Sequence, residues 1–138
     1  NKDQEIVLDL PAELPPVEVD DDMIRRVLIN LLENAVKYTP PESKINVSVK
    51  RMEDHLLFSI EDSGPGIPAE KRSTIFDKYT RLQAESGPRG IGLGLAFCRL
   101  AVEGHGGSIW VEEGSRGGAL FAFTVPIADS NGDEYLDL

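Results

Sequence analysis

The stretch NLLENAVKYTP, residues 30–40, forms the second half of a predicted amphipathic helix. Apolar residues recur at helical spacing from residue 24 onward and predict one buried face. These residues are Ile24, Val27, Leu28, Leu31, Leu32 and Ala35. Asn30, Asn34 and Lys37 fall at positions i, i+4 and i+7, so they share one stripe along the helix. The stripe indicates a pocket lining, and the alternative is a helix with ordinary polar residues on its exposed face.

The polar stripe carries residue types that suit a metal ion and a phosphate. Mg²⁺ usually takes one or two protein oxygens and fills its other positions with water and phosphate oxygens. The amide oxygen of Asn34 fits that role. Lys37, one turn further on, would supply a point charge to a phosphate, and Glu33 could polarise a nucleophile or a water molecule.

A strand is predicted before the helix at residues 5–10, followed by a proline-rich loop and a short strand at residues 17–19. Any of Asp20, Asp21 and Asp22 can cap the helix, because carboxylates are favourable near its positive end. The proline pair at residues 40 and 41 ends it.

A hairpin is predicted after the helix, with strands Lys44–Lys50 and His55–Asp62. Asp62 has the same parity as Leu56 and Ile60, so its carboxylate would point toward the core. A buried carboxylate needs hydrogen-bond donors, and the exocyclic amine of adenine would be one. Gly64 and Gly66 follow, in a turn that either brings backbone close to a flat ligand or is simply tight.

The second half of the chain has a short predicted helix, Ala69–Ile75, with Phe76 as an anchor, and then a mobile loop over residues 77–89. The sequence GIGLGL, residues 90–95, opens an apolar helix that ends at Gly104, and such a loop presents N–H groups to phosphate. Its spacing disfavours a P-loop and a dinucleotide fold. Residues 108–113 and 118–125 predict a closing hairpin, and residues 129–138 an acidic, disordered tail.

Composition favours one globular domain, because 138 residues with 41% hydrophobic content can build a real core. The single cysteine, Cys98, rules out an internal disulfide framework and indicates a reducing, cytoplasmic location. No signal peptide or membrane-spanning run is evident. The chain lacks an initiator Met, so we expect it to be an excised fragment.

The net charge of −10 argues against a nucleic-acid partner, whose binding depends on Lys and Arg neutralising phosphates. Much of the acid lies at residues 20–22 and in the tail after residue 128. Basic residues instead lie near the candidate site segments, so local charge can oppose the global balance. They are Lys37, Lys78, Arg81 and Arg89.

Four motifs, in this order, resemble the N, G1, F and G2 boxes of the catalytic and ATP-binding domain of sensor histidine kinases. They are Asn30-x-x-x-Asn34-Ala35-x-Lys37-Tyr38, Asp62-x-Gly64-x-Gly66, Ile75-Phe76 and Gly90-x-Gly92-Leu93-Gly94-Leu95. These kinases belong to the GHKL group of ATPases and kinases. The resemblance implies an α/β (α+β) two-layer sandwich of the Bergerat type, with a mixed, largely antiparallel sheet of about five strands covered by three helices. The expected domain covers residues 1–128.

Residue roles follow from the resemblance. Asn34 would bind Mg²⁺, Asn30 and Lys37 would face the phosphates of ATP, and Arg89 would reach the γ-phosphate. Asp62 would accept the adenine amine. The other implied nucleotide contacts are Tyr38 near the base or ribose, Gly64, Gly66 and Ile67 in the base pocket, Phe76 at the lid, and Gly90, Ile91, Gly92, Leu93, Gly94 and Leu95 around the triphosphate.

The phosphate acceptor implied by the resemblance is a histidine in a separate helical dimerisation domain, and neither His55 nor His105 suits that role. The isolated fragment would then be monomeric, whereas the intact sensor, membrane-anchored or not, would be a homodimer. The intact sensor would pass the phosphate to a response regulator. Two alternatives stay open. One is a GHKL-type ATPase in which Glu33 activates water, and the other is a non-catalytic scaffold module.

Overall fold

The computed structural model describes residues 4–13, 15, 17–77, 93–115 and 117–127. Its elements are β1 (Glu5–Asp9), α1 (Asp21–Tyr38), β2 (Lys44–Arg51), β3 (His55–Glu61), the 3-10 helix η1 (Ala69–Lys71), α2 (Leu93–Gly104), β4 (Ile109–Glu113) and β5 (Ala119–Pro126). The five strands have the order β1-β2-β3-β5-β4. Only β1 and β2 are parallel, and the other neighbours are antiparallel. The predicted mixed, largely antiparallel sheet is confirmed.

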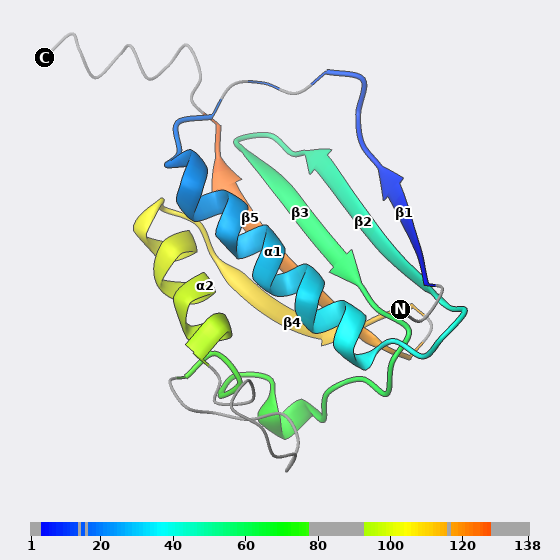
Figure 1. The fold of residues 1–138 in the computed structure, drawn as a ribbon. Helices are drawn as coiled ribbons and strands as arrows, with labels where there is room; N and C mark the ends of the chain where they lie inside the picture. Colours follow the sequence, from blue (N-terminus) through cyan, green and yellow to red (C-terminus); the bar gives the residue numbers. More distant parts are fainter. Residues whose placement is uncertain (1–3, 14, 16, 78–92, 116, 128–138) are drawn as a thin grey trace, which may run out of the picture.

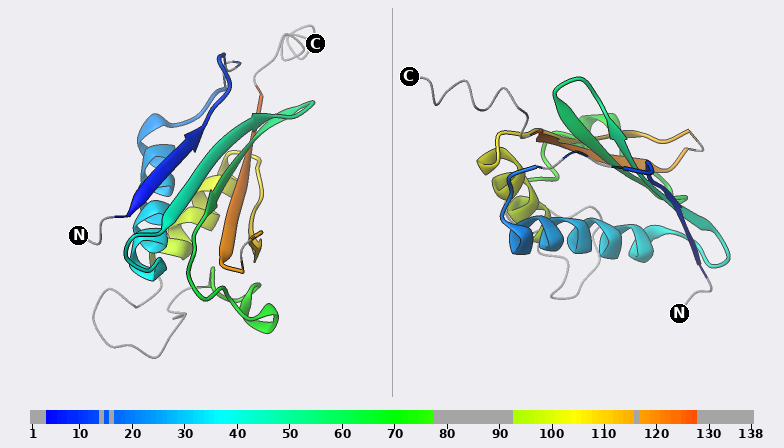
Figure 2. Two further views of the ribbon diagram at one scale, coloured as in Figure 1. Left: turned by 90° about the vertical axis from the view of Figure 1, so that its right-hand side faces the viewer. Right: turned by 90° about the horizontal axis from the view of Figure 1, so that it is seen from above.

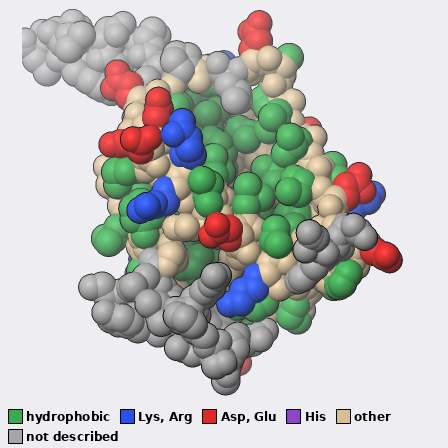
Figure 3. Space-filling model, in the orientation of Figure 1, with side chains coloured by type: hydrophobic (Ala, Val, Ile, Leu, Met, Phe, Trp, Pro, Cys, Tyr) green, Lys and Arg blue, Asp and Glu red, His purple; other side chains and the backbone are tan. Residues whose placement is uncertain are grey.

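The helices α1 and α2 lie side by side on one face of the sheet, which makes the predicted two-layer sandwich (Figures 1 and 2). They cover the part of the sheet formed by β3, β4 and β5. Figure 3 shows hydrophobic side chains gathered beside α1, and Ile6 and Leu8 of β1 are exposed. None of the helices in the described ranges is long and apolar enough to cross a membrane.

Helix α1 follows the sequence expectation closely. Asp20 is the N-cap, and its Oδ1 accepts a hydrogen bond from the Met23 amide at 3.1 Å. The predicted apolar stripe is the buried face, with Val27 and Leu31 fully inaccessible to solvent. The helix ends at Tyr38, just before the proline pair. Local sequence signals therefore predict the start, the buried face and the end of α1.

Helix α2 is fixed against α1 by its buried face and by its last turn. Cys98 lies in the interface, 3.8 Å from the Val27 carbonyl oxygen. His105 Nδ1 donates to the Ala101 carbonyl oxygen at 2.7 Å, and its Nε2 accepts from the Asp20 amide at 2.9 Å. A neutral imidazole makes both bonds, so His105 joins the end of α2 to the start of α1. His105 therefore packs at the end of α2 and caps it.

Two predicted elements are wrong. Residues 17–19 form no strand, because their backbone does not pair with a strand of the sheet. The side chains of Val17 and Val19 pack against the core instead. The predicted helix over residues 69–75 contains only η1, followed by turns. Its first bonds run from residue i to residue i−3, the tighter 3-10 pattern, as in Lys71 to Pro68. The third helix of the expected layer is thus a single turn in the described part of the chain.

Gly107 should be irreplaceable, because a Cβ at this position would overlap the backbone carbonyl of Thr124 in β5. We expect Gly107→Ala to lower the free energy of unfolding by about 2 kcal/mol. Gly104→Ala is the matched control, since a Cβ there meets nothing within 4 Å. That variant should be neutral or more stable by up to ~1 kcal/mol. Urea unfolding measures both, and equal stabilities would contradict the packing described.

The Cys98 thiol should be unreactive in the folded protein. Burial raises its pKa from 9.0 to about 12. At pH 8 a disulfide reagent should react with it only after global unfolding, and fast reaction without denaturant would contradict this burial. Above pH 9 the unfolded chain loses the thiol proton first, so the free energy of unfolding should fall until about pH 12. Cys98→Ala should remove that fall.

Candidate functional site

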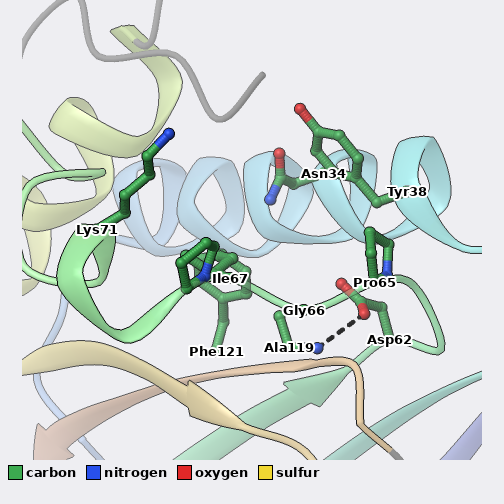
Figure 4. A pocket seen from close by; sticks show the side chains of 10 residues that line it. Asn34, Tyr38, Asp62, Pro65, Gly66, Ile67, Lys71, Ala119 and Phe121 are labelled. Carbon is green, nitrogen blue, oxygen red and sulfur yellow. Dashed lines mark hydrogen bonds between the residues drawn. The ribbon is translucent and has the colours of Figure 1, made fainter. Parts of the chain in front are cut away.

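A pocket lies between α1 and the segment that follows β3 (Figure 4). Its walls are mostly apolar, with a few polar groups. The described lining residues are Asn34, Tyr38, Asp62, Pro65, Gly66, Ile67, Pro68, Lys71, Ala119 and Phe121. An apolar cavity with a few convergent polar groups is typical of a small-molecule site.

Asp62 is the buried polar group of this pocket, with 5% of its surface exposed. Its Oδ1 accepts hydrogen bonds from the amides of Gly64 and Ala119, each at 2.9 Å. The second carboxylate oxygen points toward the pocket in Figure 4. The inward direction predicted from strand parity is therefore confirmed. Two backbone donors offset the cost of burial, and one oxygen remains directed at a ligand.

Glycines allow the backbone around Asp62 to pack closely. A Cβ on Gly64 would overlap the Tyr38 carbonyl oxygen, and one on Gly118 would overlap the Asp62 backbone. Gly66 has φ of 83°, which a side chain would strain. Gly118 was not among the predicted site residues. Its role, which is to leave room for the Asp62 backbone, is visible only once the fold brings the two residues together.

Asn34 and Tyr38, one turn apart on α1, face the pocket from above in Figure 4. The Asn34 Nδ2 atom is buried and has no hydrogen-bond partner in the described part of the chain. An unpaired buried amide is costly, so it is a group that a ligand would satisfy. Rotating the amide by 180° would exchange its oxygen and nitrogen, and either atom can therefore meet the ligand.

The other members of the predicted stripe lie elsewhere. Asn30 Nδ2 donates to the Gly94 carbonyl oxygen at 3.2 Å, at the start of α2. Asn30 and Glu33 line a second groove on the outer side of α1, beside Phe97. The Lys37 ammonium lies 5.4 Å from the centroid of the Tyr38 ring. The structure thus brings together Asn34, Tyr38, Asp62, Gly66 and Ile67 as lining residues, but not the whole stripe.

Phe76 and Leu95 belong to the core beneath the site. Phe76 packs edge-to-face on Phe121, a pocket-lining residue, with ring centroids 6.1 Å apart. Leu95 is 8% exposed and lies in the same cluster. Sequence reasoning missed five of the described lining residues, which are Pro65, Pro68, Lys71, Ala119 and Phe121. Arg89, Gly90, Ile91, Gly92 and the side chain of Leu93 lie outside the described residues.

Comparison with known proteins places this geometry in one family. Residues 19–129 match the family described as histidine kinase-, DNA gyrase B-, and HSP90-like ATPase. The adaptive-response sensory kinase SasA of Gloeothece citriformis is 46% identical over 127 residues, which is 91% of this chain and 32% of that protein. The SasA kinase of a Synechococcus strain is 47% identical over 135 residues, 96% of this chain and 35% of that protein.

Two solved structures share the fold at appreciable identity. The catalytic domain of the histidine kinase ThkA has a TM-score of 0.80 and 33% identity, covering 91% of this chain and 82% of that one. Full-length ShkA, solved in complex with AMPPNP, has a TM-score of 0.79 and 30% identity over 94% of this chain and 27% of that one. This chain spans about one third of the length of its curated SasA relatives. The chain therefore belongs to the histidine kinase-, DNA gyrase B- and HSP90-like ATPase family.

Proposed function

We propose that the pocket binds the adenine of Mg-ATP and that the chain is the catalytic part of a protein-histidine kinase. The observation that carries this proposal is the buried Asp62 carboxylate, held by two amides and directed into an apolar pocket. Its relatives named as sensory kinases, and the ShkA structure with AMPPNP, support the same function.

The pocket fits adenine better than guanine. Pro65, Ile67 and Phe121 supply apolar surface for a flat ring. The exocyclic amine of adenine is a donor, so it would pair with the Asp62 oxygen that points toward the pocket. Guanine has a carbonyl oxygen at that ring position, which would place two acceptors against each other in a buried site. Discrimination between the bases would therefore come from Asp62.

The polar side of the pocket fits a magnesium phosphate. No group of three His, Cys, Asp or Glu side chains in the described ranges forms a metal cage. With its amide rotated so that the oxygen takes the place of the unpaired nitrogen, Asn34 would fit a cation that keeps most of its ligands as water and phosphate oxygens. Magnesium would supply neutralisation of phosphate charge there. Asn30, Lys37, Arg89 and residues 90–95 would face the phosphates, with Glu33 close to the acceptor.

The acceptor histidine would come from the dimerisation domain of the intact, homodimeric protein. Both ring nitrogens of His105 are occupied by backbone partners. His55 Nδ1 lies 2.7 Å from an Asp54 carboxylate oxygen at the start of β3. The chain itself would bind nucleotide and position the γ-phosphate, and a response regulator would receive the phosphate afterwards. Residues 1–128 would form this catalytic domain, with the acidic residues 129–138 as a tail.

Asp62→Asn should weaken ATP binding at least about tenfold. The amide oxygen would stay on the Gly64 and Ala119 amides, so the new NH₂ group would face the adenine amine, donor against donor. The same NH₂ could bond guanine, so the preference for ATP over GTP should narrow. Calorimetric titration with non-hydrolysable analogues measures both effects.

Glu61→Gln is the matched control, because it removes the same charge one residue earlier, where the carboxylate bonds Ser115 outside the pocket. It should leave nucleotide affinity unchanged. Equal affinities for the parent and the Asp62 variant would contradict the assignment of the base pocket. A parent chain that binds no adenine nucleotide would contradict the proposed function of this chain.

Asn34→Ala should abolish the part of the ATP affinity that depends on Mg²⁺, because the protein loses its oxygen ligand. Adenosine carries no phosphate and should bind the variant as it binds the parent. The measurement is a pair of titrations, with Mg²⁺ and with a chelator, for each ligand. If Mg²⁺ strengthens ATP binding equally in parent and variant, Asn34 is not the ligand.

A further inference from the structure

Lys71 is a pocket residue to which neither the motifs nor the family resemblance gives a role. It lines the cavity on the side opposite Asp62, with the apolar floor of Ile67 and Phe121 between them (Figure 4). It is the one positively charged side chain among the described lining residues. Its ammonium forms no ion pair within the described part of the chain.

The backbone of Lys71 is firmly held, although its side chain is exposed. Its amide donates to the Pro68 carbonyl oxygen at 2.9 Å, and its own carbonyl oxygen accepts from the amides of Thr74 and Ile75 at 3.2 Å. Ile75 is completely buried in the core. The turn is thus anchored below the pocket, and the ammonium projects from a fixed point at its rim (Figure 4).

The pocket is therefore polarised, with a carboxylate at one end and an ammonium at the other. ATP has the matching pattern, since its base offers an amine donor and its phosphates are anionic. An ammonium has three donors and no acceptor, so it suits a phosphate oxygen. The protein as a whole carries a net charge of −10, which makes a local cation valuable for holding an anion.

We propose that Lys71 binds the phosphates of the nucleotide and, together with Asp62, fixes the direction in which ATP lies in the pocket. This proposal rests on the proposed function. It adds a phosphate contact from η1, across the cavity from Asp62. Lys71 is then a substrate-binding residue that the sequence motifs do not mark.

The test is calorimetric titration of the parent chain, Lys71→Met and Lys71→Arg with adenosine and with ADP. We expect Lys71→Met to lose roughly two- to fivefold in ADP affinity, the size of an exposed charge contact. Its adenosine affinity should be unchanged, and Lys71→Arg should retain ADP affinity. The ADP affinity of Lys71→Met should also fall less steeply with added salt than that of the parent.

Lys50→Met is the matched control, because it removes the same charge from an exposed position on β2, outside the pocket. It should bind ADP as the parent does. Equal ADP affinity for the parent and Lys71→Met would overturn the proposal while leaving the proposed function intact. Equal loss of adenosine and ADP would also overturn it, because the lysine would then support the base or the fold. A parent that binds neither ligand would overturn both proposals.

Discussion

The arrangement of the whole pocket depends on one buried carboxylate and the two backbone amides that hold it. Asp62 follows β3 directly, and its own amide donates to the Ala119 carbonyl oxygen at 2.9 Å, which continues the β3–β5 pairing. Its Oδ1 then binds Ala119 on β5 and Gly64 in the next turn. In the described part of the chain, both of these bonds are made by Oδ1, and the second oxygen points toward the pocket. A side chain at position 118 would overlap the Asp62 backbone, so the site requires a glycine there.

The same turn is tied to the end of α1, which brings the helix layer and the sheet to one pocket. Ser63 donates its amide to Thr39 Oγ1 at 3.2 Å, and Thr39 is completely buried. The Gln4 side chain donates to carbonyl oxygens of Val36 and Thr39 from the start of the chain. Because these contacts fix the last turn of α1 over the turn after β3, the Asn34 amide and the Asp62 carboxylate are presented to the same ligand. The polar residues of the pocket act as a preorganised set.

Local sequence patterns predicted the elements whose signals are local. The helical period predicted α1 and its buried face, and strand parity predicted that Asp62 points inward. Contacts between distant segments were not predictable in this way. The Asn30 bond to Gly94, the overlap that restricts Gly118 and the position of Lys71 all depend on how α2, β5 and η1 meet α1 and β3. At Val17 and Val19 a local pattern predicted a strand that does not form. Their alternation reflects packing against the core rather than strand pairing. The resemblance to histidine kinases named the right family because its four motifs combine such distant segments.

The most direct measurement is a crystal structure of this chain with Mg²⁺ and a non-hydrolysable ATP analogue. The account predicts that the adenine lies between α1 and the turn after β3, with its exocyclic amine within hydrogen-bond distance of the free Asp62 oxygen. The phosphates should lie between Asn34 and Lys71, with Mg²⁺ bound to the amide oxygen of Asn34. A nucleotide seated elsewhere, for example in the groove beside Arg26 and Phe97 on the outer side of α1, would contradict the account. So would an adenine in the pocket whose amine does not face Asp62.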